Sequence, residues 1–152
     1  MKTATNTYKL GIDAGSTTIK LVLLDAEEEI IHKSYRRHKA DVRMTLIGEL
    51  ARIKELVGDA EIELCITGSA GMGIAEHIGA GFVQEVIASV NLVRKLFPDT
   101  RTLFDIGGED AKMVFLDGDK HPDIRMNGSC AGGTGAFIDQ MASLMNIPVE
   151  EL

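Results

Sequence analysis

The chain is 152 residues long, enough for one domain with a hydrophobic core or for two small lobes. Its composition, 45% hydrophobic and 26% charged, is typical of a soluble globular protein, and no apolar run approaches the roughly 20 residues of a membrane span. The net charge of −7 argues against nucleic-acid or membrane partners, which attract basic surfaces. Residues 1–7 are expected to be a disordered lead-in without a secretion signal, and the two cysteines are too few for a disulfide scaffold, so we expect a cytoplasmic protein.

Three strands and a helix are expected in the first third of the chain. Apolar and β-branched residues predict strands at 8–13, 18–25 and 30–37, separated by a glycine-rich turn and an acidic turn. The apolar periodicity that follows predicts a helix between an N-cap at Asp41 and a stop at Gly58. The basic run YRRHK is typical of a solvated sheet edge. The four histidines show no metal-ligand spacing, so we assign them surface or core positions.

The pattern then changes and restarts after Pro98. The next predicted elements are a strand at 61–67, a loop at 68–73, and helices at 74–79 and 83–97. They are followed by strands at 101–106, 111–117 and 121–127, and by a helix with a core face of Phe137, Met141 and Leu144. Because residues 146–152 look like the opening of another helix, we expect the N-terminal part of a longer protein.

Two segments of the chain repeat each other. LGIDAGSTTIKLVLLD aligns with LFDIGGEDAKMVFLD, and each copy is predicted to be a strand, an acid, a glycine turn and a second strand. The six identities pair Asp13 with Asp105, Gly15 with Gly107, Lys20 with Lys112, Val22 with Val114, Leu24 with Leu116 and Asp25 with Asp117. Chance similarity between two hairpins is the alternative, but the identities include both turn glycines and the acid before each.

The residue types of this repeat are those of a phosphate site. Glycine lets backbone N–H groups approach an anion closely, and Ser16, Thr17 and Thr18 add hydroxyl donors. An aspartate does not bind phosphate directly, but it can hold Mg²⁺ or a metal-bound water. We therefore expect the two turns to clamp phosphates from both sides, with Asp13 and Asp105 near the metal.

A third glycine-rich stretch, MNGSCAGGTGAF at 126–137, places Cys130 just before an apolar helix. From the residues alone, this cysteine is either a small buried thiol in a tight loop or a metal ligand, and the first interpretation is favoured. A 4Fe–4S cluster needs four thiolates, and this chain offers one suitably placed cysteine. The other cysteine, Cys65, lies on an alternating strand and is interpreted as structural.

Together these motifs resemble those of the two-lobed ATPase superfamily that includes actin, sugar kinases and heat-shock chaperones. GIDAGSTTIKLVLLD looks like its first phosphate motif and FDIGGEDAKMVFL like its second. Within the superfamily, FDIGGEDAK followed by MNGSCAGGTGAFID resembles the ATP-dependent activators of 2-hydroxyacyl-CoA dehydratases and the benzoyl-CoA reductase ATPase subunits, the BadF/BadG/BcrA/BcrD type. The resemblance covers nearly all of residues 8–152, but only roughly the first half of the family's catalytic unit.

The resemblance implies an α/β fold with a ribonuclease-H-like lobe and a mixed sheet over residues 8–97, and the start of a second similar lobe over 98–152. It implies ATP and Mg²⁺ as cofactors, with Asp13 and Asp105 matching the metal-side acids. The matching phosphate contacts are Gly15, Ser16, Thr17, Thr18 and Lys20 in the first turn, and Gly107, Gly108 and Glu109 in the second. Glu109 replaces a glutamine found in other members, and with the two aspartates it forms the implied catalytic set.

The resemblance also implies a function in anaerobic metabolism. Members are homodimers with one 4Fe–4S cluster between the subunits, two cysteines coming from each, and Cys130 matches the first of these. ATP binding and hydrolysis drive a low-potential electron, supplied by a ferredoxin or flavodoxin, into an acyl-CoA dehydratase component. Thr134 would cap the helix after the cysteine, and the helix dipole would stabilise the cluster's negative charge. The second cysteine and the adenine-binding elements would lie beyond Leu152, so residues 1–152 alone are expected to be inactive.

Two other functions fit the phosphate motifs. A sugar-kinase-like phosphotransferase would need a catalytic base aimed at a hydroxyl, and none stands out in the sequence. An actin-like assembly ATPase would polymerise with nucleotide. Because the cysteine loop argues against both, we expect an ATPase activator that delivers electrons to an acyl-CoA dehydratase or reductase.

Overall fold

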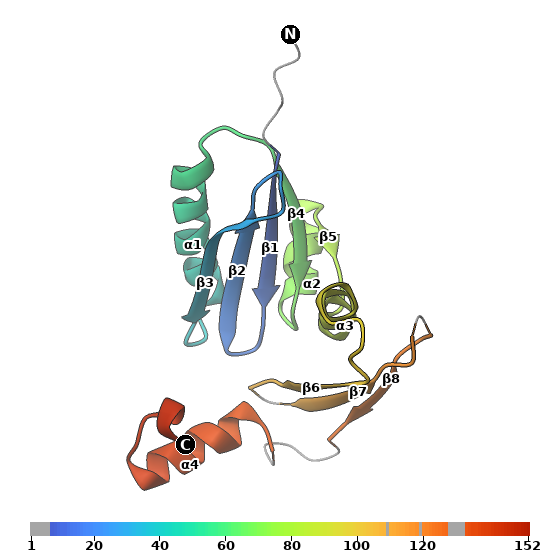
Figure 1. The fold of residues 1–152 in the computed structure, drawn as a ribbon. Coiled ribbons are helices and arrows are strands. Elements are labelled where there is room, and N and C mark those ends of the chain that lie inside the picture. Colours follow the sequence, from blue (N-terminus) through green and yellow to red (C-terminus); the bar gives the residue numbers. More distant parts are fainter. Residues whose placement is uncertain (1–6, 109, 119, 128–132) are drawn as a thin grey trace. The chain divides into compact units, whose positions relative to one another are not determined.

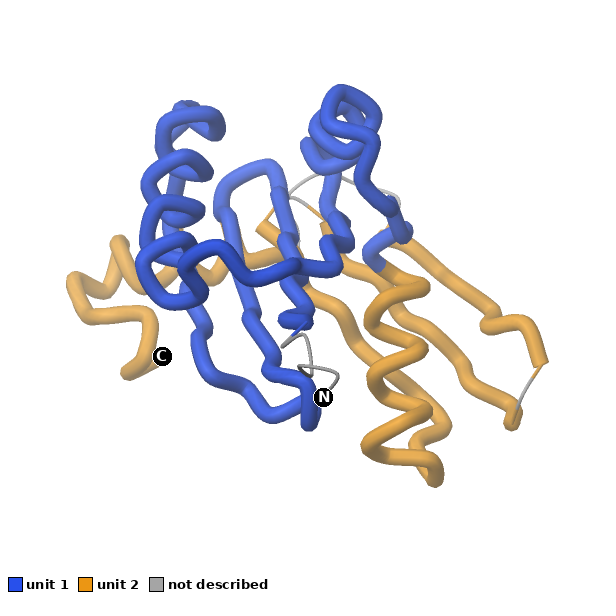
Figure 2. The backbone as a smooth tube through the Cα atoms, turned by 90° about the horizontal axis from the view of Figure 1, so that it is seen from above, with its two compact units in different colours: residues 1–85 blue, residues 86–152 orange. Residues whose placement is uncertain are grey.

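The computed structural model describes residues 7–108, 110–118, 120–127 and 133–152. The chain forms two compact units, residues 1–85 and 86–152 (Figure 2). In these described stretches, no helix is long and apolar enough to cross a membrane.

A mixed five-stranded sheet forms the first unit (Figure 1). Its order is β3-β2-β1-β4-β5, with β1, β2 and β3 antiparallel, and with β4 parallel to both β1 and β5. The strands span Tyr8–Ala14 (β1), Thr18–Leu24 (β2), Ile30–Arg37 (β3), Ile62–Thr67 (β4) and Gly81–Phe82 (β5). The predicted mixed sheet and its first four strands are confirmed, whereas β5 is too short to show an alternating pattern in the sequence.

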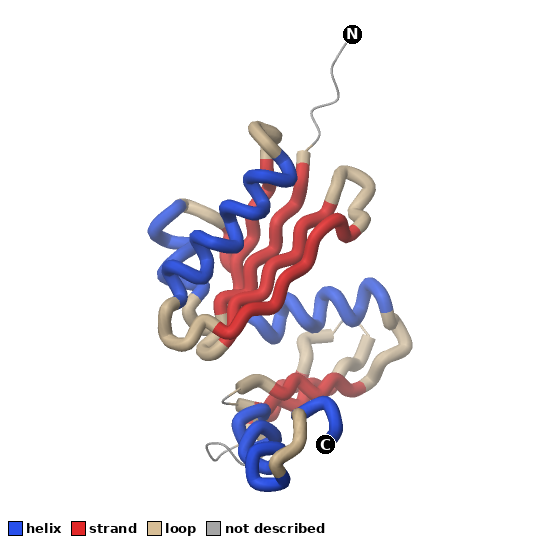
Figure 3. Tube along the Cα trace, turned by 90° about the vertical axis from the view of Figure 1, so that its left-hand side faces the viewer, coloured by secondary structure: helices blue, strands red, loops and turns tan. Residues whose placement is uncertain are grey.

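Helices α1 (Val42–Val57) and α2 (Gly71–Ile78) pack on one face of this sheet (Figure 3). The buried core between them consists of Leu10, Ile12, Ile19, Leu21, Leu23, Leu46, Ile53, Ile66 and Ala75. Successive side chains of a strand point to opposite faces. Asp13 and Lys20, which alternate with these core residues, therefore lie on the face away from the helices.

Helix α1 begins and ends where the sequence predicts. The Asp41 carboxylate accepts a hydrogen bond of 3.0 Å from the Met44 N–H, and Gly58 follows the last helical residue with a φ of 60°. A buried acid of α1, Glu49, lies 3.2 Å from Nε of Arg36 on β3. The helix is thereby tied to the edge strand of the sheet.

A three-stranded antiparallel sheet of order β6-β7-β8 forms the centre of the second unit. Its strands span Thr102–Ile106 (β6), Ala111–Phe115 (β7) and Asp123–Met126 (β8); helix α4 (Gly135–Met145) and a 3₁₀ turn (Val149–Glu151) follow. Helix α3 (Glu85–Leu96) packs on this sheet through a cluster of Val86, Val90, Val114 and Leu116. Nearly all of α3 therefore belongs to the second compact unit, whereas the sequence prediction places this helix in the first lobe, which ends at residue 97.

Some details of the predicted elements are wrong. Helix α2 begins at Gly71, inside the predicted loop, and Val83 precedes α3. Of the predicted core face of α4, Met141 is half-buried, but Phe137 is 43% and Leu144 73% accessible to solvent. Apolar periodicity identifies a face of a helix, but it does not say what that face packs against. After α4, Pro148 and a 3₁₀ turn over Val149–Glu151 stand where the sequence predicts the opening of another helix.

The loop between β4 and α2 closely approaches the end of β1, where the first glycine turn begins. Gly68 in this loop has a φ of 91°, and a Cβ atom there would lie 2.4 Å from the Ala14 carbonyl oxygen. That carbonyl accepts a hydrogen bond of 2.9 Å from the Ala70 N–H. Only glycine fits this position, because a side chain would both strain the backbone and collide with β1.

We expect Gly68→Ala to destabilise the full-length protein by roughly 2–4 kcal/mol, because the loop must move away from β1. Thermal unfolding measures the change. Gly73→Ala is the matched control, since a Cβ at this α2 position meets nothing within 4 Å. The control should be stabilised by up to about 1 kcal/mol. Wild-type stability in Gly68→Ala would contradict the close approach.

Candidate nucleotide site

The two repeated segments fold into hairpins with the same register. In the first hairpin, Asp13 of β1 pairs with Lys20 of β2, and in the second, Asp105 of β6 pairs with Lys112 of β7. Each of these residues is paired with the same partner position in both copies of the repeat. The internal repeat therefore extends from the sequence to the pairing of the strands.

The two turns also share the hydrogen bond that closes them. The Gly15 N–H donates to the Thr18 carbonyl at 2.9 Å, and the Gly107 N–H donates to the Asp110 carbonyl at 2.9 Å. A Cβ on Gly107 would lie 2.6 Å from an oxygen of the Asp110 side chain. A larger residue at this position would therefore displace the Asp110 side chain.

An ion pair joins the acid and the lysine of the first hairpin. Lys20 Nζ lies 2.6 Å from Asp13 Oδ2 and 5.7 Å from the centre of the Tyr35 ring. Although partial burial acts in the opposite direction, the hydrogen bond and the charge of Asp13 hold the pKa of Lys20 above its ordinary value. The second carboxylate oxygen of Asp13, Oδ1, is buried and accepts no hydrogen bond from the described residues.

In the second hairpin, Lys112 lies between two carboxylates. Its Nζ is 2.7 Å from Asp110 Oδ2 and 4.0 Å from Asp105 Oδ2, and its side chain is only 11% exposed. Oδ2 of Asp105 is buried and has no hydrogen-bond partner in the part of the chain that the structure describes. Because Asp110 occupies the repeat position of Thr18, a carboxylate replaces a hydroxyl in this turn.

The predicted hydroxyl donors of the first turn differ in exposure. Ser16 and Thr17 are exposed, whereas Thr18 is 7% exposed. A phosphate could therefore reach the hydroxyls of Ser16 and Thr17 directly, while that of Thr18 faces the protein. In the second turn, Gly107 and Gly108 are half-buried.

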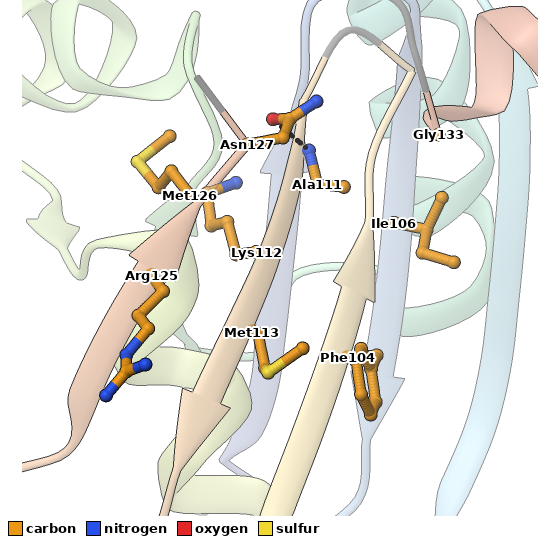
Figure 4. A pocket seen from close by; sticks show the side chains of 9 residues that line it. All are labelled: Phe104, Ile106, Ala111, Lys112, Met113, Arg125, Met126, Asn127 and Gly133. Carbon is orange, nitrogen blue, oxygen red and sulfur yellow. Dashed lines mark hydrogen bonds between the residues drawn. The ribbon is translucent and has the colours of Figure 1, made fainter. Parts of the chain in front are cut away.

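The segment that carries Cys130 leaves β8 at a residue bound to the second hairpin. Cys130 itself, within 128–132, lies outside the described residues, as does Glu109. The side-chain oxygen of Asn127 accepts a hydrogen bond of 3.1 Å from the Ala111 N–H (Figure 4). The Asn127 N–H donates to the Ala111 carbonyl, also at 3.1 Å.

The other end of the same segment is bound to the second turn. The Gly135 N–H, at the start of α4, donates to the Gly107 carbonyl at 2.8 Å, and the Ala136 N–H donates to the Gly108 carbonyl at 3.1 Å. Thr134 occupies the N-cap position as predicted, although its side chain makes no capping hydrogen bond to the helix. The segment around Cys130 therefore begins and ends on the predicted phosphate hairpin.

An open hollow of about 440 Å³ lies beside the contact between Asn127 and Ala111 (Figure 4). It is lined by Phe104, Ile106, Ala111, Lys112, Met113, Arg125, Met126, Asn127 and Gly133. The lining is mostly apolar. Its described residues include two cations but no acid, so the hollow adds no proton acceptor to the site.

The sequence did not indicate one contact of the first turn, that of His38. Tyr35 is 64% exposed on edge strand β3, as the solvated-edge prediction requires, but His38, later in the same basic run, is 6% exposed. Its ring Nε2 lies 3.2 Å from the Gly15 carbonyl oxygen. No spacing rule predicts this contact, because it depends on where β3 ends relative to the turn.

The two aspartates fit Mg²⁺ only together with a phosphate ligand. Among the described residues, no group of three or more His, Cys, Asp or Glu side chains is placed to hold a metal ion. Asp13 and Asp105, each within its own unit, each have one carboxylate oxygen without a hydrogen-bond partner among the described residues. Mg²⁺ at phosphate sites is usually bound by one or two carboxylates together with phosphate oxygens and water.

The fold is that of an actin-like ATPase, as its similarity to solved structures shows. The activator of 2-hydroxyisocaproyl-CoA dehydratase from Clostridium difficile, solved with bound ADPNP, has a TM-score of 0.79 and 30% identity over 95% of this chain and 54% of its own. Component A of (R)-2-hydroxyglutaryl-CoA dehydratase from Acidaminococcus fermentans has a TM-score of 0.79 and 27% identity over 94% of this chain and 56% of its own.

The chain belongs to the BadF/BadG/BcrA/BcrD ATPase family, whose sequence model matches residues 10–152. The (R)-2-hydroxyglutaryl-CoA dehydratase activating ATPase of A. fermentans is 31% identical over 95% of this chain and 56% of its own length. The 2-hydroxyisocaproyl-CoA dehydratase activator of Clostridioides difficile is 31% identical over 95% of this chain and 55% of its own. The resemblance in the motifs is confirmed, and the chain spans little more than half the length of these relatives.

We expect Lys112→Met to destabilise the full-length protein by roughly 1–3 kcal/mol, because it leaves two carboxylates facing each other without their cation. The shift in thermal unfolding measures this loss. Lys120→Met is the matched control, since Lys120 pairs with Asp117 where both side chains are largely exposed, and no measurable change is expected. Equal shifts in the two variants would show that Lys112 stabilises the protein no more than an exposed lysine does.

Proposed function

We propose that this chain is the N-terminal, nucleotide-binding part of an ATPase activator. The activator couples ATP binding and hydrolysis to the transfer of a low-potential electron into a (R)-2-hydroxyacyl-CoA dehydratase or a related acyl-CoA reductase. Membership of the ATPase family, and relatives named as activators of such dehydratases, support the proposal. The observation that carries it is the double anchorage of the Cys130 segment to the second phosphate hairpin, at Asn127 and at Gly135.

The two turns supply the phosphate contacts of the proposed site. In the first turn, the backbone N–H groups after Gly15 and the exposed hydroxyls of Ser16 and Thr17 donate to phosphate oxygens. Lys20 contributes positive charge on the same hairpin. The backbone of Gly107 and Gly108 contributes from the second turn, and Glu109 orients the attacking water.

Asp13 and Asp105 hold Mg²⁺, directly or through bound water. Each keeps one buried carboxylate oxygen without a hydrogen-bond partner among the described residues, which is the state that a cation or its water would satisfy. Lys20 pairs with the other oxygen of Asp13, whereas Lys112 lies 4.0 Å from the same Asp105 oxygen, Oδ2, that has no hydrogen bond within the described part of the chain. When bound, Mg²⁺ neutralises charge on the phosphates during hydrolysis.

Cys130 is proposed as a ligand of a 4Fe–4S cluster shared between two copies of the protein in a homodimer. Such a cluster supplies one-electron transfer at low potential. A ferredoxin or flavodoxin is the proposed electron donor, and the dehydratase component is the acceptor.

We expect Asp105→Asn in the full-length protein to lower the kcat of ATP hydrolysis on the order of 100-fold, because the metal loses a charged ligand. Steady-state phosphate release measures the effect. Asp117→Asn is the matched control, since Asp117 lies at the far end of β7 and is largely exposed; its kcat should stay at the wild-type value. A wild-type rate in Asp105→Asn would exclude the metal-side role.

We expect Cys130→Ser, purified without oxygen, to lose the iron and the visible absorption of the cluster while ADPNP binding persists. Cys65→Ser is the matched control and should keep both, because Cys65 is an exposed free thiol on β4. Iron content and the visible spectrum measure the outcome. Iron retained in Cys130→Ser would exclude the cluster and leave the nucleotide site standing.

A further inference from the structure

His38 is buried directly against the first phosphate turn. It follows β3 and is 6% exposed. Its backbone N–H donates to the Thr17 carbonyl at 3.2 Å, and its ring Nε2 lies 3.2 Å from the Gly15 carbonyl oxygen. A single residue thus contacts two carbonyls of the turn, one on either side of Ser16.

The hydrogen bonds of the ring determine which nitrogen carries the proton. The Ala40 N–H donates to Nδ1 of His38 at 3.1 Å, so Nδ1 is the acceptor. In a neutral imidazole the proton is then on Nε2. Nε2 therefore donates to the Gly15 carbonyl, and the neutral ring bridges the turn to its own backbone.

The backbone after His38 holds the ring in this orientation. Lys39 and Ala40 have φ angles of 49° and 67°, a region that residues other than glycine adopt at an energetic cost. The Asp41 N–H closes this tight turn on the His38 carbonyl at 2.7 Å. Because Asp41 also caps α1, the position of His38 is set by the helix as well as by the strand.

The contact with Gly15 sets the direction of the next N–H group. In a trans peptide, the C=O and the following N–H point in opposite directions. With the Gly15 carbonyl bound to His38, the Ser16 N–H points away from the ring, and Ser16 itself is exposed. A rotated peptide would present the carbonyl oxygen there, and that oxygen repels an anion.

The second turn shows the same arrangement with a different donor. Gly107, the repeat equivalent of Gly15, has its carbonyl bound by the Gly135 N–H of α4 at 2.8 Å. The side chain of His38 makes in the first turn the bond that the backbone of α4 makes in the second. The equivalent carbonyl is thus bound in both turns, although by different donors. This indicates that both turns depend on the orientation of this peptide group.

We propose that His38 is a positioning residue for nucleotide binding. Its neutral ring holds the Gly15–Ser16 peptide so that the Ser16 N–H is directed outward to a phosphate oxygen. His38 itself does not touch the nucleotide. This inference rests on the proposed binding of ATP.

Two variants of His38 separate its two side-chain hydrogen bonds. In His38→Asn, the side-chain oxygen replaces Nδ1 and keeps the bond to Ala40, but nothing reaches Gly15. In His38→Gln, the amide nitrogen replaces Nε2 and keeps the bond to Gly15. In the full-length protein, calorimetric titration with Mg²⁺ and ADPNP should show about tenfold weaker binding for asparagine and a change of less than about twofold for glutamine. His77→Asn, on the exposed end of α2, should bind as the wild type does.

Thermal unfolding of each variant accompanies the titrations. Wild-type affinity in His38→Asn, or an equal loss of affinity in both variants, would overturn the positioning role. If His38→Asn does not fold, the result for His38→Gln is used instead. Unchanged affinity for ADPNP in His38→Gln supports the role, and a tenfold loss of affinity in the folded variant overturns it. A wild-type protein that fails to bind ADPNP would overturn the proposed function itself, which is a distinct result.

Discussion

The orientation of a few peptide groups is the constraint on which both glycine turns depend. The carbonyls of Gly15 and Gly107 are each bound by a donor from another segment of the same unit. In a trans peptide the C=O and the N–H of the next residue point in opposite directions. When the carbonyl is bound inside the protein, the N–H group that follows it therefore faces outward. Glycine alone does not achieve this, since a flexible turn can present either face of the peptide to an anion.

The two hairpins share their register but not their charge. In the first, one lysine and one acid form a single pair, and the exposed part of the turn carries the hydroxyls of Ser16 and Thr17. In the second, Lys112 is shared by two acids. Hydroxyl groups donate hydrogen bonds to phosphate oxygens, whereas carboxylates bind divalent cations. The charges therefore favour phosphate binding at the first turn and metal binding at the second.

Both hairpins were predictable because apolar and β-branched runs on either side of a short glycine turn are local signals, and the repeat indicates that the two copies share one arrangement. The cap of α1 at Asp41 was predictable for a similar reason, since capping depends on neighbours in the sequence. His38 and the exposed Phe137 depend instead on long-range placement. A basic run does not reveal that one of its residues is buried against a neighbouring hairpin, and periodicity does not reveal whether a helical face is covered.

The start of α4 on the second turn changes the electrostatics expected around Cys130. The favourable effect of a helix N-terminus on a negative group comes largely from N–H groups that lack partners in the first turn. Two of these, on Gly135 and Ala136, are bound to the carbonyls of Gly107 and Gly108. Part of the positive end of the helix is therefore bound to the second hairpin. A shift of the Gly107–Gly108 backbone would therefore act directly on the start of α4.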